Sequence, residues 1–532
     1  MDQVLNVSDI RMKPTCKPIV FLLLLAFTTL QCSRKYDLVI SGGTLYDGSG
    51  RAPFKADVGI TDGVVRHIGR IRAANTEVID ANGLYLSPGF IDMHTHCDGG
   101  LSIPGMSAAQ NYLMQGVTTV VTGNCGSGTY RVAEYFELLD SIGIGPNVVH
   151  LVGHGTLRGA VMGQEDRAPS ADEMKEMKEL LNMGLKQGAA GMSTGLFYAP
   201  GSYAETGEII ELVRELKAYH GIYTSHIRDE GSFGLGLIAS IEEAIAIGET
   251  AGVPVQISHI KALGKPVWGL SGEVTDMIAA ARGRGVKVMA DQYPYTASNT
   301  GLSAAVLPRW VQAGGATASR LTDPDLLPGI RDEMAVNIEK RGGPASLMII
   351  SYAADSSYNG KSLAEISELQ GTTPVETAID LILKGGSGVI SFNMDESDVL
   401  HFMKQDYVMT CSDGHVQALG EGMPHPRNFG AFTRKIRKYV IEDGIMTMEK
   451  AIRAATSLPA ESLGLKDRGK IAEGYVADVV IFDPRTIRDR ATYTDPHHYS
   501  EGIIYLLVNG EPVVEHGTYN GKLAGKTLRM NR

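Results

Sequence analysis

Residues 116–126 read GVTTVVTGNCG, a run of β-branched residues that ends in a glycine-rich turn. Such a run predicts a buried strand followed by a loop. The pattern recurs along the chain, and helical stretches at 172–188 and 239–252 separate several of the repeats. Because strands that alternate with helices pair in parallel, we expect an α/β fold with a closed (β/α)8 TIM-like barrel over residues 89–459. The other expected strands are NVVHLVG (147–153), AAGMSTG (189–195), GIYTSHIR (221–228), VPVQISH (253–259), VKVMADQYPY (286–295), GVISFN (388–393) and YVMTCSDG (407–414).

The sequence on either side of the barrel predicts short strands joined by tight turns. Residues 36–88 contain alternating apolar positions and Asp-Gly or Asn-Gly turns, and a similar sequence pattern returns between residues 460 and 530. Since the two ends match in composition, we expect them to form one small β-sandwich beside the barrel. Residues 297–347 contain LPRW, AGGATA, DPDLLPG and RGGP, which predict an insertion over the barrel mouth.

The bulk composition excludes several classes of protein. The 532 residues are 43% hydrophobic and 20% charged, which suits a globular chain with a barrel-sized core and excludes a fibrous or disordered one. A net charge of −11 leaves no basic stripe, so nucleic acid is not an expected partner. The five cysteines show no paired spacing, which argues against a disulfide framework.

The first 32 residues predict a signal-peptide or lipoprotein leader. Basic residues precede an apolar run over 19–30, which has the length of a signal-peptide core and is too short to span a bilayer. Cys32 follows and resembles the acylated cysteine of a lipoprotein, although Gln31 is bulkier than the residue usual at that position. We expect an exported protein, periplasmic or tethered to a bacterial envelope membrane through Cys32; an ordinary disordered N-terminus is the alternative.

The motif PGFIDMHTHCDGG at 88–100 contains two histidines two residues apart. Alternate residues of a strand share a face, so His94 and His96 are expected to point the same way, with Asp98 in the same row if the strand persists. Two imidazoles at the C-terminal end of a barrel strand are placed to share a metal ion. On its own, the motif fits structural histidines equally well.

Four more strand ends carry candidate site residues: Cys125, His226, His259 and Asp413. One thiolate and two imidazoles satisfy the three-ligand rule of catalytic zinc and leave a position for water. A lone cysteine is usually an apolar core residue. Metal binding becomes the better interpretation of Cys125 only because His226 and His259 are expected at the same rim. Asp413 is the best general-base candidate, because a carboxylate beside Zn²⁺ stays ionised; an Asx turn is its local alternative.

From residue 36 to about residue 525 the chain resembles the N-acyl-D-amino-acid deacylase (D-aminoacylase) branch of the amidohydrolase superfamily. The resemblance implies a tight zinc site at Cys125, His226 and His259, with His94, His96 and Asp413 around a weaker second metal position. The motifs that carry it are PGFIDMHTH (88–96), GVTTVVTGNCG (116–126), GAAGMSTGLFYAPG (188–201), SHIRDE (225–230), QISHIK (256–261), DQYPY (291–295), CSDG (411–414), HPRNFGAFTR (425–434) and the segment from 456 to 483.

The same resemblance implies the substrate and the residues that bind it. The expected reaction is zinc-dependent hydrolysis of N-acyl-D-amino acids, or related D-dipeptides, to a carboxylate and a free D-amino acid. Arg427, Lys261 and Tyr293 are expected to hold the substrate's α-carboxylate, with Tyr198 nearby. A planar guanidinium suits a carboxylate bidentately, so Arg427 is the most attractive of these. Solvation at the surface is the alternative for Lys261.

Two other functions stay open at this point. The first is a cyclic-amide hydrolase of the hydantoinase or dihydroorotase kind, whose two metals are commonly bridged by a carboxylated lysine where this chain offers Cys125. The second is a non-catalytic lipoprotein that binds a peptide-like ligand in the barrel. A hydrolase needs both metal ligands and a base, and this sequence contains both.

Overall fold

The computed structural model describes residues 36–72 and 76–530, so the predicted leader and Cys32 lie outside the described residues. Within these ranges, eight parallel strands form the predicted barrel. Asp413 N donates to His94 O at 2.9 Å, and His96 N donates to Gly414 O at 2.8 Å, which joins the last strand to the first. The strands are β8 (Phe90–Asp92), β9 (Val117–Thr122), β10 (Asn147–His150) continued by β11 (Val152–Gly153), β12 (Gly191–Gly195), β13 (Ile222–His226), β14 (Val255–Ile257), β15 (Val288–Gln292) and β19 (Val408–Thr410).

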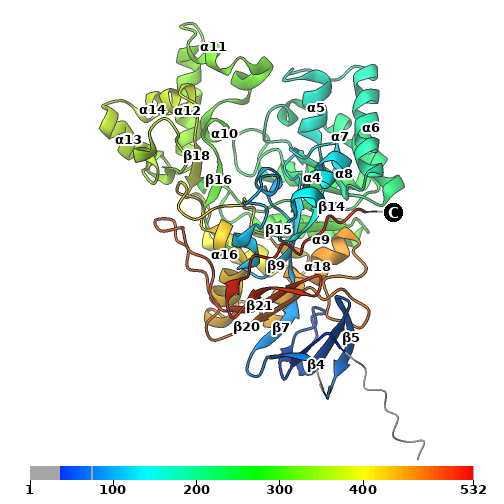
Figure 1. Cartoon of the computed structure of the whole chain (residues 1–532). Coiled ribbons are helices and arrows are strands. Elements are labelled where there is room, and N and C mark those ends of the chain that lie inside the picture. The colour runs from blue at the N-terminus through cyan, green and yellow to red at the C-terminus, as the bar shows by residue number, and fades with distance from the viewer. Residues whose placement is uncertain (1–35, 73–75, 531–532) are drawn as a thin grey trace, which may run out of the picture.

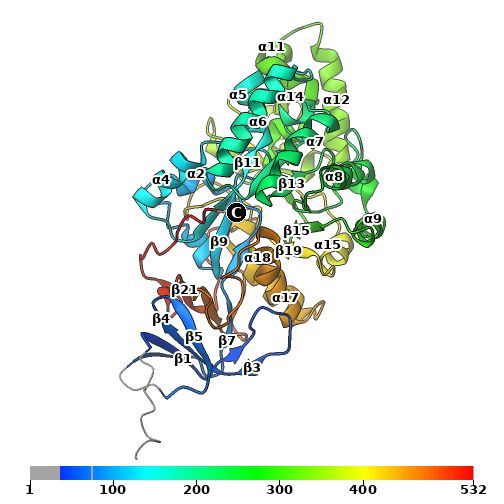
Figure 2. The ribbon, with the colours of Figure 1, turned by 90° about the vertical axis from the view of Figure 1, so that its right-hand side faces the viewer.

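Helices follow the strands and cover the outside of the barrel (Figure 2). The predicted helical stretches correspond to α6 and α8; α6 begins at a capping box between Ser170 and Glu173 and buries one apolar stripe that includes Leu181. The helices are α2 (Asp98–Leu101), α3 (Gln110–Leu113), α4 (Val132–Ile142), α5 (His154–Met162), α6 (Ala171–Lys186), α7 (Thr206–Glu215), α8 (Leu237–Ala251), α9 (Ser271–Gly283), α15 (Glu396–Met403), α16 (Arg427–Arg434), the π-helix η7 (Lys435–Glu442), α17 (Met448–Ala455) and α18 (Ser457–Leu463).

The insertion between β15 and α15 is longer than the predicted 297–347. The run at 388–393, predicted as a barrel strand, instead contains β18, which pairs antiparallel with β16 and β17 inside the insertion; that prediction is wrong. A short apolar run looks the same in both contexts, and β8 takes the eighth place in the barrel. The elements are β16 (Ser298–Gly301), α10 (Leu302–Val306), η4 (Arg309–Gly315), α11 (Thr317–Leu321), α12 (Leu327–Lys340), β17 (Leu347–Ile349), α13 (Leu363–Gln370), α14 (Pro374–Leu383) and β18 (Gly388–Ser391).

The two ends of the described chain meet in a small β-sandwich at the foot of the barrel (Figure 1). One sheet has the order β5-β4-β1-β6, and the other, β23-β22-β21-β20-β7-β2-β3, mixes strands from both ends. Apolar side chains such as Ile40, Leu86 and Ile481 fill the space between the sheets. The strands are β1 (Leu38–Ser41), β2 (Thr44–Leu45), β3 (Phe54–Lys55), β4 (Asp57–Thr61), β5 (Val64–Gly69), β6 (Glu77–Asp80), β7 (Tyr85–Pro88), β20 (Val479–Phe482), β21 (Ile503–Val508), β22 (Glu511–Glu515) and β23 (Thr518–Tyr519).

The last described residues return to the barrel. Leu528 N donates to Val148 O at 2.8 Å, and Val148 N donates to Lys526 O at 2.9 Å, so this segment runs alongside β10. The predicted assignment of residues up to 530 to the sandwich therefore extends several residues too far. Over the described ranges, no helix combines the length and the apolar character needed to cross a bilayer.

Candidate metal centre

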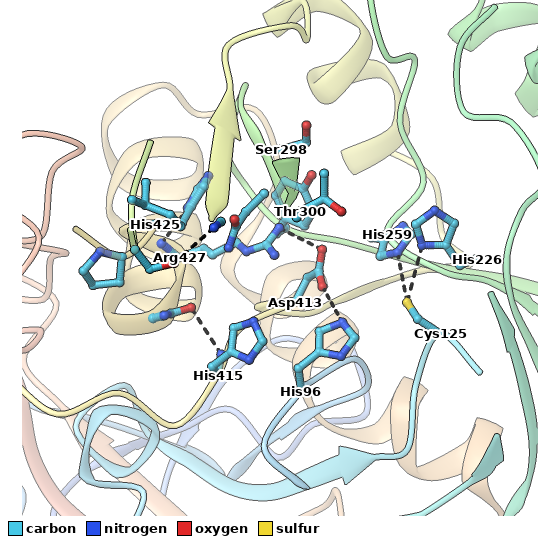
Figure 3. A pocket seen from close by; sticks show the side chains of 18 of the residues that line it. His96, Cys125, His226, His259, Ser298, Thr300, Asp413, His415, His425 and Arg427 are labelled. Atoms are coloured by element: carbon cyan, nitrogen blue, oxygen red, sulfur yellow. Dashed lines mark hydrogen bonds and ion pairs between the residues drawn. The ribbon is translucent and has the colours of Figure 1, made fainter. Parts of the chain in front are cut away.

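The candidate site residues gather at the C-terminal rim of the barrel (Figure 3). His226 ends β13, while Cys125 and His259 lie in the loops directly after β9 and β14. His94 and His96 follow β8, and Asp413 follows β19. Parallel strands end at one rim, so residues far apart in the sequence arrive at one place.

Cys125 lies at the centre of the cluster. Its Sγ is 3.4 Å from His226 Nδ1, 3.6 Å from His259 Nε2 and 3.3 Å from His94 Nε2. Two ligands held tetrahedrally at the usual zinc–nitrogen and zinc–sulfur distances lie about 3.5 Å apart. The spacing of Cys125, His226 and His259 therefore fits a zinc ion.

The protonation chemistry of the cluster also fits a cation. Burial lowers the pKa of His226 and of His94 well below the ordinary value, which leaves both imidazoles neutral, the form that binds metal. Burial, together with the nearby Asp413 and Glu230, raises the pKa of the Cys125 thiol. A coordinated cation reverses that preference, since it deprotonates a ligating thiol.

The backbone is strained at three of these residues. Cys125, His259 and Asp413 have φ angles of +52°, +36° and +50°, in the left-handed region that side-chain-bearing residues rarely adopt. Such strain clusters at functional sites, where the surroundings hold it in place. Near Cys125, the turn needs Gly123, because a Cβ there would lie 2.1 Å from Leu151 O. The loops thus aim side chains at the cluster rather than follow the lowest-energy backbone.

His94, His96 and Asp413 surround a second position beside the first. His94 and His96 form a group of ligand atoms with Cys125, and His94 forms another with His259 and Asp413. The strand-alternation argument for His94 and His96 holds only in part, because β8 ends at Asp92 and both histidines lie in the segment after it. Asp98 does not continue the row: it begins α2, and its carboxylate is 3.8 Å from His150.

Asp413 is an ionised carboxylate held between a cation and an imidazole. Its Oδ2 accepts a hydrogen bond from Arg427 Nη1 at 2.8 Å, and its Oδ1 lies 3.2 Å from His96 Nε2. Burial alone opposes ionisation, but the Arg427 charge and the nearby histidines outweigh it and lower the pKa of Asp413 well below its ordinary value. Arg427 is thus shared between Asp413 and the cavity.

All four predicted substrate-binding residues line one cavity of about 550 Å³ over the cluster. Arg427 is 1% exposed, and its Nε has no hydrogen-bond partner in the described structure. The hydroxyl of Tyr293 donates to the sulfur of Met394 at 3.7 Å. Lys261 is buried, which excludes the surface alternative, and Tyr198 donates to or accepts from Thr300 at 3.1 Å.

Two carboxylates that support the histidines were missed from the sequence. Glu230 Oε1 lies 2.9 Å from His259 Nδ1 and accepts from Lys261 Nζ at 2.5 Å. Burial would raise the pKa of Glu230, but the charge on Lys261 and the histidines lower it overall. Asp291 accepts from His259 N at 2.8 Å. Glu230 thus lies at the far nitrogen of His259, where a carboxylate orients the ring of a ligating histidine and strengthens its hold on a metal. Asp291 instead holds the His259 backbone.

A sequence signal for both carboxylates exists in hindsight. Glu230 lies four residues after His226 in SHIRDE, and Asp291 is the acidic residue near the end of a barrel strand, in DQYPY. Acidic residues are common in strand-end loops, however, and only the tertiary structure shows that these two reach His259.

Comparison with known proteins agrees with this geometry. The amidohydrolase family model matches residues 77–514. A D-aminoacylase of Alcaligenes xylosoxydans xylosoxydans is 35% identical, over 93% of this chain and 98% of its own length. An N-acyl-D-glutamate deacylase of the same organism is 36% identical, over 90% and 93%. The crystal structure of N-acyl-D-glutamate deacylase from Bordetella bronchiseptica, with zinc and a phosphonate inhibitor, is similar with a TM-score of 0.81 and 34% identity, covering 93% of this chain and all of that one.

A barrel with a cysteine and histidine cluster at its C-terminal rim is the arrangement of a metal-dependent enzyme. The chain belongs to the amidohydrolase family, and its predicted resemblance to the D-aminoacylase branch is confirmed. The predicted fold class is confirmed as well.

Replacing Cys125 tests the metal centre. Cys125→Ala should weaken zinc binding by more than about 100-fold, since loss of even a group behind a ligand costs about 10- to 100-fold. Zinc content and a chelator competition measure this. Because the Cys125 thiol must lose its proton and its pKa is raised, zinc affinity should rise with pH between 6 and 8, and this rise should flatten in the variant.

Cys97→Ala is the matched control, because Cys97 is buried outside every group of candidate ligands. It should keep wild-type zinc content. Equal zinc affinity in the Cys125 variant and the wild type would remove the thiolate from the metal centre.

Proposed function

We propose that this chain hydrolyses the amide bond of N-acyl-D-amino acids, or related D-dipeptides, to a carboxylate and a free D-amino acid, with zinc as its cofactor. The observation that carries the proposal is the meeting of Cys125, His226 and His259 with the ionised Asp413 in one cavity. The similarity to a D-aminoacylase over 93% of the chain supports it. Bound zinc would polarise the amide carbonyl and activate a water molecule.

Asp413 serves as the base and later as the acid. Its carboxylate is ionised at neutral pH and accepts the proton of the attacking water. Breakdown of the amide needs a protonated leaving amine, and Asp413 returns its proton there. The Arg427 contact makes Asp413 a weak base in the free protein. A substrate carboxylate that shares Arg427 weakens this hold and raises the basicity of Asp413 when substrate is bound.

The substrate's α-carboxylate binds on the Arg427 side of the cavity. The Nε of Arg427 is buried without a partner, so an incoming carboxylate supplies the missing acceptor. Tyr293 lies beside this group, since the Arg427 guanidinium carbon is 4.8 Å from the centre of the Tyr293 ring. With the carbonyl at the cluster and the carboxylate at Arg427, a side-chain pocket on one remaining side selects the hand. The D preference follows from the relatives.

The two alternatives are weaker on specific grounds. A cyclic-amide hydrolase of the hydantoinase kind commonly uses a carboxylated lysine between two metals, whereas the residue shared by the two candidate metal positions here is Cys125. A binding-only lipoprotein has no use for a strained, ionised Asp413 beside a candidate metal centre.

A substrate panel tests the proposed activity. The zinc-loaded protein should hydrolyse N-acetyl-D-leucine at least about 100-fold faster than N-acetyl-L-leucine, in terms of kcat/KM, because a mismatched hand misplaces the amide by an ångström or more. Free amino acid released is the measurement. Faster turnover of a hydantoin than of any N-acyl-D-amino acid would establish the cyclic-amide alternative instead.

The role of Asp413 is tested by an isosteric change. Asp413→Asn should lower kcat by about 100-fold or more while zinc content stays near wild type, because the amide cannot accept the proton. Asp98→Asn is the control, since Asp98 belongs to none of the candidate ligand groups and does not line the cavity, and it should keep wild-type kcat. Unchanged kcat in Asp413→Asn would exclude Asp413 as the base.

We also propose that residues 1–32 direct export and that Cys32 carries a lipid anchor, on the sequence pattern alone. In a Gram-negative host, the full chain should fractionate with membranes and incorporate labelled palmitate. Cys32→Ser should abolish the label and release the protein from the membrane fraction. A full chain that stays in the cytoplasm with its leader intact contradicts the proposal.

A further inference from the structure

His425 is a completely buried histidine in the loop between β19 and α16, two residues before Arg427. It lines the same cavity as Arg427 and as Ser298 of the insertion (Figure 3). It belongs to none of the candidate ligand groups, and the proposed reaction gives it no role. A buried imidazole in the cavity wall therefore needs an explanation of its own.

Both ring nitrogens of His425 are bound to backbone groups whose hydrogen-bonding roles are fixed. Nε2 lies 3.0 Å from the carbonyl oxygen of Ala297, which only accepts, so Nε2 is the donor. Nδ1 accepts from the backbone N–H of Arg427 at 3.0 Å. Only the neutral imidazole with its proton on Nε2 satisfies both partners. Burial, together with the charge on Arg427, lowers the pKa of His425 well below its ordinary value and keeps the ring neutral.

The bond to Arg427 caps the start of α16. The first N–H groups of a helix have no partner inside the helix, and Pro426, which precedes Arg427, has no side-chain acceptor to offer. His425 supplies that acceptor to the first N–H of α16. The same bond fixes the backbone from which the Arg427 side chain reaches Asp413 Oδ2 at 2.8 Å.

The bond to Ala297 anchors the same ring at the start of the insertion. Ala297 directly precedes β16 and is itself completely buried. Tyr295 and Tyr493 lie edge-to-face with the His425 ring, with centroids 5.2 Å and 5.1 Å away. The packed, rigid ring thereby sets the Arg427 backbone at a fixed place relative to the insertion.

We propose that His425 is a positioning residue for the α-carboxylate site: anchored on Ala297, it holds the Arg427 backbone where the guanidinium can bind the substrate's carboxylate. This inference rests on the proposed function, which places that carboxylate at Arg427. A binding group misplaced by about an ångström costs up to about 100-fold in rate. Loss of His425 therefore weakens recognition of the carboxylate and leaves the candidate metal ligands in place.

His425→Ala is tested on two substrates that differ only in the α-carboxylate. N-acetyl-D-leucine carries it, and N-acetyl-D-leucinamide replaces it with a neutral amide; acetate release by the zinc-loaded full chain measures both. The variant should lower kcat/KM for the acid by about 10- to 100-fold, chiefly through KM, because Arg427 holds the carboxylate in the ground state and in the transition state alike. For the amide, kcat/KM should stay within about threefold of wild type, since no interaction with the carboxylate is lost.

Two conservative variants separate the two hydrogen bonds. Asparagine places an amide oxygen at the position of Nδ1, so His425→Asn keeps an acceptor for the Arg427 N–H but is too short to reach Ala297. Glutamine extends as far as Nε2, so His425→Gln keeps a donor for Ala297 and loses the acceptor at the position of Nδ1. His425→Asn should therefore recover more of the preference for the acid than His425→Gln. Equal or better recovery in His425→Gln contradicts the proposed role of the Arg427 bond.

His150→Ala is the matched control. His150 is also completely buried, and its ring nitrogens lie 2.8 Å from Thr122 Oγ1 and 3.1 Å from Thr129 O, but it does not line the cavity. Its loss should change kcat/KM for the acid and for the amide by the same factor. The same equal change in His425→Ala would show a purely structural role and overturn the proposal, as would unchanged kcat/KM for both substrates.

Two further measurements separate failure of this inference from failure of the proposed function, which fails if no D-substrate is hydrolysed. Nitrogen-15 NMR of histidine-labelled protein reports on the His425 ring, identified as the signal missing from His425→Asn. A neutral ring with its proton on Nε2 supports the anchored geometry, and a charged ring or a proton on Nδ1 overturns it. Calorimetry with the acid and the amide then replaces kcat/KM: a preference for the acid that His425→Ala removes supports the inference, and equal affinities in the wild type overturn it.

Discussion

The structure depends on holding several polar groups together at one mostly buried point on the barrel rim. Cys125 is 101 residues from His226 and 134 from His259, yet its sulfur lies within 3.6 Å of a nitrogen of each. Neutral imidazoles and a thiol meet at this point beside two carboxylates, an arrangement that suits a bound cation. The barrel makes the meeting possible because its parallel strands end at one rim, and the loops bear the backbone strain that aims the side chains.

The carboxylates around this point are matched to cations in a regular way. Glu230 faces Lys261 and the outer nitrogen of His259, while Asp413 faces Arg427 and His96. Each pair keeps its carboxylate ionised in spite of burial, as the lowered pKa values of Glu230 and Asp413 indicate. One carboxylate thereby orients a candidate ligand, and the other is left free to exchange a proton.

Much of this arrangement was predictable because the barrel converts sequence pattern into position. An apolar run followed by a polar loop places Cys125, His226, His259 and Asp413 at the rim without knowledge of the side chains between them. The pattern failed at 388–393, where a run of the same composition pairs antiparallel inside the insertion. It also could not reveal that Arg341, which follows α12 outside the barrel, lines the cavity.

The insertion has a hydrophobic core of its own, built from side chains such as Leu302, Ile330 and Val389, separate from the core beneath the barrel. It contributes Arg341 to the cavity, whereas the candidate metal ligands all come from barrel strand ends. The insertion therefore supplies part of the cavity wall from a separately packed module, while the barrel supplies the candidate metal ligands and Arg427. Natural variation or design in the outer module is free to retune what enters the cavity without disturbing the reactive centre.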